Sequence, residues 1–145
     1  MHTPSRPSLF VRLLLLASAL VASGVGASIL IAPAWFHAAN GIDLGVDPSL
    51  WSEVRAPGAA LLALGALIGC GAFVPTFTVP SAAIAAAVYL SYGLARCVSL
   101  VIDGWPAPGL VGAMGIELAL GGACLVFLLR RTVGASTAAT CEELA

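Results

Sequence analysis

The feature that most constrains this chain is a set of four long, mostly apolar runs. They cover about residues 9–32, 56–74, 81–102 and 109–129. A helix of about 20 apolar residues crosses the hydrocarbon core of a bilayer, so each run is long enough for one span. The segments between the runs are too short for a separate soluble domain. We therefore predict a single all-α domain over residues 1–145, an integral membrane four-helix bundle.

The composition excludes a soluble globular protein. Of the 145 residues, 60% are hydrophobic and only 9% are charged, whereas soluble domains carry about 25% charged residues. The chain has no lysine and a net charge of -1, so no basic patch indicates a nucleic acid as partner. The partner that this composition predicts is the lipid bilayer.

The first run also has features of a signal peptide. Arg6 and Arg12 precede the apolar stretch "LLLLASALVASG", and small residues follow it. The apolar part of a signal peptide has about 7–15 residues, whereas this run continues through "ILIA" to Pro33. We predict an uncleaved span, and cleavage after Ala27 is the alternative that the residues leave open.

The arginines at the chain ends predict the orientation in the membrane. They flank the first and last runs, and positively charged flanks stay in the cytoplasm. Because four spans return the chain to its starting side, we predict that both termini are cytoplasmic. The loop over residues 33–52 has no arginine or lysine, as expected of an outer loop. The tryptophans then all lie at the outer interface, where anchoring is their ordinary role: Trp35, Trp51 and Trp105.

Local signals predict the helix ends and the packing positions. Asp47 and Pro48 form an N-cap followed by a proline at the first helical position, so the second helix begins before the hydrocarbon. Gly65, Gly69 and the glycines of the fourth run let helix backbones approach closely. We interpret them as packing positions within the bundle, and a homo-oligomer through these Gly-rich faces is the open alternative. The small, polar tail over residues 132–145 predicts disorder.

The least expected residue of the third run is Arg96. A guanidinium inside a membrane is costly and does not escape by losing its proton, so it needs a partner. Measured from the outer ends of their runs, Arg96 is about 9 Å deep and Glu117 is about 12 Å deep. These two residues lie on sequential, antiparallel helices. We predict that they pair.

Further polar side chains are expected in the outer half of the bundle. Residues spaced by seven or four along the third run can share one helix face, and the second helix begins with charged residues. The interpretation stays open among an ion pair that only fixes helix register, a ligand or proton site, and a partner-binding surface. The predicted polar cluster comprises Glu53, Arg55, Tyr89, Tyr92, Arg96, Asp103 and Glu117.

The same residues carry a resemblance to a known family. The chain resembles the bacterial membrane proteins catalogued as domain of unknown function 4345, over about residues 13–131. The resemblance implies a small four-helix protein of the bacterial inner (plasma) membrane with no established activity, and Pro57 departs from its pattern. It rests on the order and spacing of "GID" at 41–43, "EVRAPGAALLALGAL" at 53–67, "YGLARCVSLVIDGWPAP" at 92–108, "GIELALGG" at 115–122 and "LLRR" at 128–131.

No sequence motif predicts an enzyme. A nucleophile elbow, a P-loop and a dinucleotide fingerprint are all missing from the sequence. The four cysteines lack metal-ligand spacing, and His37 has no second histidine near it for a zinc site, so we predict no cofactor and no metal. We predict a non-enzymatic protein whose polar cluster binds a small molecule, a lipid headgroup or a partner. The alternatives are a small transporter or proton-coupled permease subunit, and then a membrane enzyme with Glu117 or Asp103 as acid or base.

Overall fold

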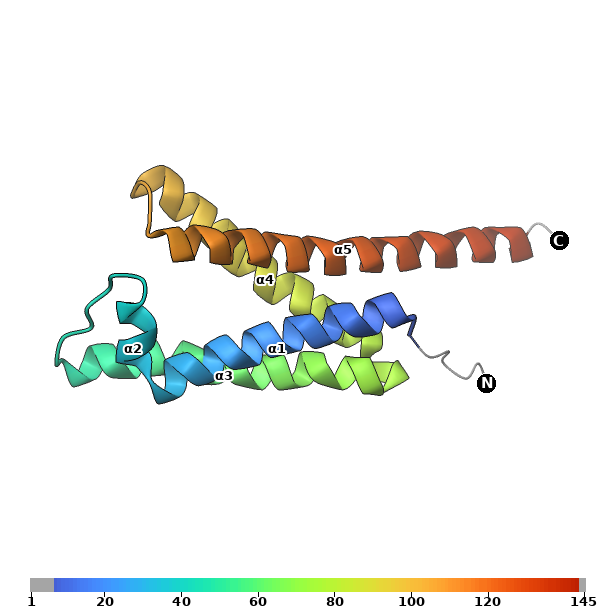
Figure 1. Ribbon diagram of the computed structural model, residues 1–145. Coiled ribbons are helices and arrows are strands. Elements are labelled where there is room, and N and C mark those ends of the chain that lie inside the picture. The colour runs from blue at the N-terminus through green and yellow to red at the C-terminus, as the bar shows by residue number, and fades with distance from the viewer. Residues whose placement is uncertain (1–6, 144–145) are drawn as a thin grey trace.

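Helices make up nearly all of the chain, as predicted. The computed structural model describes the backbone of residues 7–143 and the side chains of residues 7–132, and this part of the chain contains no strand. Four of its helices are long and apolar enough to cross a membrane. The elements are α1 (Leu9–Ile31), α2 (Pro33–Ala38), α3 (Pro48–Phe73), the short 3-10 helix η1 (Pro75–Phe77), α4 (Thr78–Ile102) and α5 (Pro108–Glu143) (Figure 1).

The four long helices form two antiparallel pairs. α1 lies along α3, α5 lies along α4, and α4 runs obliquely across the molecule (Figure 1). α1 begins and α5 ends at the same end of the molecule, which we call the terminal end. The opposite end carries α2 and the turn between α4 and α5, and we call it the α2 end.

The α1–α3 pair is held at backbone-to-backbone distance by glycines. A Cβ atom placed on Gly26 would lie 2.5 Å from the backbone nitrogen of Leu62, and one on Gly65 would lie 2.7 Å from that of Ser23. Only glycine leaves room for such an approach. The prediction that Gly65 packs inside the bundle is therefore confirmed. A Cβ atom on Gly69 would lie 3.4 Å from the Ala19 Cβ across the same pair, an ordinary packing distance.

Only some of the α5 glycines that were predicted to pack within the bundle do so. A Cβ atom on Gly121 would lie 2.9 Å from the backbone nitrogen of Leu90, so this glycine packs as predicted. Gly112, Gly115 and Gly122 have no atom within 4 Å of such a Cβ. Their face of α5 is therefore not a packing surface within the bundle.

The two pairs join in the terminal half of the molecule. The residues buried there are small or aliphatic and come from all four long helices. Hydrogen bonds add to this contact: Thr78 Oγ1 donates to the Gly71 carbonyl over 3.0 Å, and Ser81 Oγ donates to the Leu67 carbonyl over 2.9 Å. The α3–α4 turn is thereby fixed at this end. The fully buried members of this core include Leu15, Ser18, Ile68, Ala82, Ala85 and Cys124.

The start of α3 confirms the predicted N-cap. Asp47 Oδ1 accepts a hydrogen bond of 2.9 Å from the backbone nitrogen of Ser49, and Pro48 is the first helical residue. α3 then continues through Pro57. Since a proline has no N–H, the carbonyl of Glu53 loses its helical donor at this point.

Two segments differ from the prediction. The loop expected over residues 33–52 contains α2, which begins with Pro33 at its first position. The tail expected to be disordered from residue 132 is helical as far as Glu143, because α5 continues without interruption. This tail contains alanines, the strongest helix formers, and no proline ends the helix.

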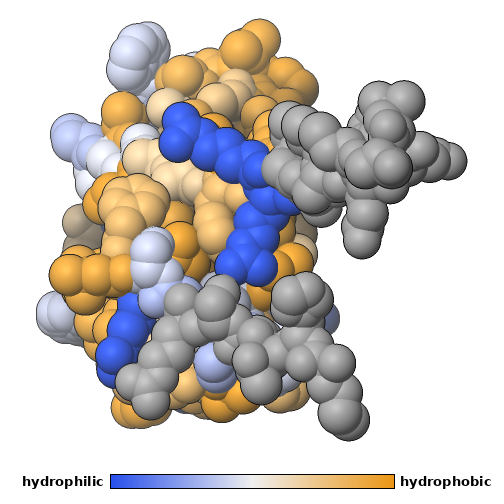
Figure 2. Space-filling view, turned by 90° about the vertical axis from the view of Figure 1, so that its right-hand side faces the viewer, coloured by the Kyte–Doolittle hydropathy of each residue, from blue (hydrophilic) through white to orange (hydrophobic). Residues whose placement is uncertain are grey.

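The terminal end carries arginines beside aromatic rings. Figure 2 views the molecule from this end and shows hydrophilic side chains among apolar ones. The Arg12 guanidinium lies 5.3 Å from the centre of the Phe73 ring, and that of Arg131 lies 5.5 Å from the centre of the Phe127 ring. Arg6, one of the arginines on which the predicted membrane orientation rests, lies outside the described residues. The tryptophans all belong to the α2 end: Trp35 in α2, Trp51 in the first turn of α3 and Trp105 between α4 and α5.

The glycine contacts predict that alanine substitutions at Gly26 and Gly24, two residues apart on α1, have different effects on stability. Gly26→Ala should cost about 1–3 kcal/mol because its methyl group overlaps the α3 backbone. Gly24→Ala should cost nothing, since no atom lies within 4 Å of its Cβ position. Equilibrium unfolding of the detergent-solubilised protein would measure both changes. Equal stability of the two variants would contradict the tight α1–α3 contact.

Candidate functional site

A cavity separates the two helix pairs toward the α2 end. Its volume is about 300 Å³, near the lower limit for small-molecule sites. Its apolar wall comes from α1 and α3 and includes Val25, Ile29 and Leu61. α4 and α5 supply the polar wall, which contains Tyr89, Tyr92, Arg96 and Glu117. Other residues of α4 and α5 in the lining, such as Val88 and Ile116, are apolar, so the cavity is mostly apolar with its polar groups gathered on one side.

The ion pair predicted between Arg96 and Glu117 is present in this wall. Arg96 Nε lies 2.9 Å from Glu117 Oε2 and 3.2 Å from Oε1, so one N–H group is shared by both carboxylate oxygens. The Glu117 side chain is 13% exposed and that of Arg96 is 32% exposed. The carboxylate is thus nearly enclosed, whereas the guanidinium extends to the cavity and its edge.

The two tyrosines of the predicted cluster have different roles. Tyr89 is 3% exposed, and its hydroxyl donates to the Ser18 carbonyl on α1. This bond connects the two helix pairs at the base of the cavity. Tyr92 is 39% exposed, and its hydroxyl has no hydrogen-bond partner among the residues whose side chains are described. The Tyr92 hydroxyl is therefore available to bind another group.

The short helix α2 and the residues after it close part of the cavity, which was not predicted. Phe36 and Asn40 contribute to the lining. Asn40 Nδ2 donates to the Phe36 carbonyl over 3.3 Å, and its Oδ1 lies 2.6 Å from the position a Cβ would take on Gly109 at the start of α5. Proline followed by a helix-compatible "AWFHA" was the available signal for α2, but nothing in it indicated contact with α5.

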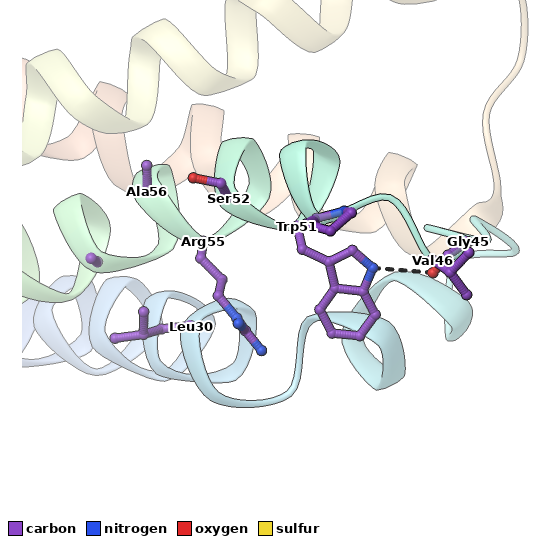
Figure 3. Close-up of a pocket in the computed structure, with 9 residues that line it drawn as sticks. Leu30, Gly45, Val46, Trp51, Ser52, Arg55 and Ala56 are labelled. Carbon is purple, nitrogen blue, oxygen red and sulfur yellow. Dashed lines mark hydrogen bonds between the residues drawn. The ribbon is translucent and has the colours of Figure 1, made fainter.

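Three residues of the predicted cluster lie outside the cavity. Asp103 follows α4, where Ser99 Oγ donates to its Oδ2 over 2.7 Å. Glu53 is exposed on α3. Arg55 forms no ion pair within the described part of the chain. It lies on a face of α3 that is turned away from α4 and α5 (Figure 3).

Arg55 instead lies beside Trp51 in an open hollow of about 790 Å³ (Figure 3). Its guanidinium carbon is 5.3 Å from the centre of the indole ring, a cation–π distance. The indole Nε1 donates to the Gly45 carbonyl over 3.1 Å, which holds the ring in place. This arrangement separates Arg55 from the cavity.

His37 also has a local partner. Its Nδ1 lies 2.8 Å from the Pro33 carbonyl within α2, and its ring packs edge-on against Phe36. The histidine is thus part of the helix that covers the cavity and does not line it.

The charge and polarity of the residues that line the cavity are suited to binding. Arg96 and Glu117 neutralise each other, so the polar wall offers hydrogen-bonding groups without a net charge. The apolar wall can hold a hydrocarbon group. The core of the terminal half is filled by buried side chains, and the described residues include no charged group there between the cavity and the helix ends.

Comparison with known proteins gives one match. The model of the family described as Domain of unknown function (DUF4345) matches residues 10–128, which is most of the chain. This match confirms the resemblance seen in the sequence. No curated protein and no solved structure matches the chain.

The geometry predicts unequal effects for two carboxylates of the α4–α5 hairpin. Glu117→Ala leaves Arg96 unpaired and should lower the free energy of unfolding by about 2–3 kcal/mol, less than for a fully buried pair because Arg96 keeps some exposure. Asp103→Ala removes only a surface hydrogen bond from Ser99 and should change the free energy of unfolding by about 0.5 kcal/mol or less. Unfolding titrations of both purified variants would test this. A Glu117→Ala protein as stable as Asp103→Ala would contradict the importance of the pair.

Proposed function

We propose that this chain, which belongs to the DUF4345 family of unknown function, is a membrane-embedded binding protein for a small amphiphilic molecule. The ligand would occupy the cavity between the helix pairs. Its polar group would lie at Arg96, Glu117 and Tyr92, and its hydrocarbon part would lie against α1 and α3.

The observation that carries this proposal is the position of the ion pair. A charged pair in a low-dielectric environment is costly, and apolar side chains of the same volume often give equal or greater stability. If the pair served only to hold two helices together, close packing around it would be expected. Instead it borders a cavity of about 300 Å³. An intramembrane charge beside an open space favours a ligand site.

The same features favour binding over transport or catalysis. A transporter needs a polar path through both halves of the membrane. Here the polar groups of the cavity end at Tyr89, and tightly packed side chains such as Leu15, Ile68 and Ala85 follow. Among the described residues, no pair of carboxylates lines the cavity, so acid–base catalysis has little support from its geometry.

We further propose that the α2 end faces outward from the inner membrane of a bacterium. Arg12, Arg130 and Arg131 are at the terminal end, and the segments that connect the helices at the α2 end have no arginine or lysine. The excess of positive charge on cytoplasmic flanks supports cytoplasmic termini. The cavity would then lie in the outer leaflet.

Filling the cavity should remove the ligand. Ala113 lines the cavity on α5, and Ala113→Phe places a ring in it. Ala119→Phe is the matched control, because Ala119 is exposed on the same helix. Both variants would be purified from their own membranes beside wild type, and the extracted amphiphiles compared by mass spectrometry. We expect one species to be lost from Ala113→Phe alone. Identical extracts from all three proteins would contradict the proposed function.

A further inference from the structure

The guanidinium of Arg96 has hydrogen-bonding capacity that the ion pair does not use. Only Nε donates to Glu117. Neither Nη group donates a hydrogen bond to any residue whose side chain is described, although these N–H groups border the cavity. The Arg96 side chain is 32% exposed and lines the cavity, so these N–H groups can reach a ligand there. A ligand that accepts hydrogen bonds from both Nη groups would use this free capacity.

The charges of Arg96 and Glu117 restrict which kind of hydrogen-bond acceptor a ligand can place at the polar wall. Glu117 already neutralises Arg96, so an anionic ligand would place a second carboxylate or phosphate near Glu117 and meet repulsion. A cationic ligand would meet Arg96 in the same way. A neutral oxygen, such as a ketone or hydroxyl, accepts the Nη hydrogen bonds without adding a charge to the low-dielectric site. The Tyr92 hydroxyl offers a further donor.

The route into the cavity also restricts the ligand. A groove of about 310 Å³ runs between α3 and α4 on the outside of the bundle, and Leu61, Val88 and Tyr92 line both the groove and the cavity. These three side chains are therefore the boundary between the two spaces. Ala60 and Ala87, which also line the groove, are small and exposed.

The helices flanking this groove are fixed at one end only. The hydrogen bonds of Thr78 and Ser81 tie α4 to α3 at the terminal end. No side-chain hydrogen bond links α3 to α4 nearer the α2 end within the described residues. Rotation of the half-exposed Tyr92 ring would therefore open the cavity sideways without disturbing the core.

We infer that the ligand is a neutral amphiphile dissolved in the bilayer, with a ketone or hydroxyl oxygen, that enters between α3 and α4 past Tyr92. This inference rests on the proposed function and adds the ligand class and the entry route. The ketone or hydroxyl oxygen accepts from the Nη groups of Arg96. The hydrocarbon chain lies along Val25, Ile29 and Leu61.

The ligand class can be tested with four probes that share one chain length. These are methyl octyl ketone, decanol, decanoate and decylamine, each carrying fluorine at the chain end. Fluorine NMR of the protein in lipid nanodiscs would detect a saturable bound resonance. We expect that resonance for the ketone and the alcohol, and its loss in Ala113→Phe. Decanoate and decylamine should give none.

The outcomes separate this inference from the proposed function. A bound resonance for decanoate or decylamine, with none for the ketone and alcohol, would overturn the neutral class and leave the cavity as a binding site. Equal binding of all four probes would also overturn it, because the polar wall would then not discriminate. No bound resonance with any probe would count against the proposed function as well.

The route can be tested by blocking the groove. Ala87→Trp places an indole between α3 and α4, whereas Ala95→Trp places one on an exposed position of α4 that lines none of the described cavities. Exchange between bound and free ketone should slow by about tenfold or more in Ala87→Trp, for an added barrier of at least about 1.4 kcal/mol. Its affinity should not change. Exchange rates equal to those of Ala95→Trp and wild type would overturn entry between α3 and α4.

Discussion

The placement of Arg96 depends on one physical constraint: a guanidinium cannot lose its proton to enter an apolar environment. It must be paired, and Glu117 on the antiparallel neighbour is the partner. The pair links α4 to α5 in the half of the molecule where the two helix pairs separate. One N–H group of Arg96 donates to both carboxylate oxygens, and the Arg96 side chain lines a cavity. The interaction that stabilises the hairpin thus also creates the polar wall of the candidate site.

The cavity itself follows from how the rest of the chain packs. Gly26 and Gly65 bring α1 and α3 into backbone contact, and Gly121 does the same for α4 and α5. Each pair is therefore tight, while the two pairs meet closely only in the terminal half, around Leu15 and Cys124. At the other end α4 diverges (Figure 1), and α2 covers the space that this divergence leaves. The cavity is a consequence of tight pairs joined at one end.

The sequence predicts the parts of this structure that depend on strong local or energetic rules. Apolar length predicts the four long helices, the Asp47–Pro48 pair predicts the start of α3, and the cost of an unpaired charge predicts the partner of Arg96. Rotation about a helix axis is harder to predict, because helices that are apolar on all sides give no amphipathic signal. For this reason Arg55 and Asp103 were expected in the cluster and lie elsewhere. The cavity and its cover by α2 depend on the angle between helix pairs, which no local pattern encodes.

We propose that the Arg96–Glu117 pair both supports the fold and recognises a ligand. A charge-swap cycle would test both roles together: Arg96→Glu, Glu117→Arg and the double exchange, each measured for melting temperature and for the bound ketone resonance. Both single variants should be destabilised, because each places two like charges together. The double exchange should regain stability but not ketone binding, because the guanidinium then projects from α5. Single variants as stable as wild type would show that the pair does not support the fold, and a double exchange that binds the ketone as wild type does would show that Arg96 does not recognise it.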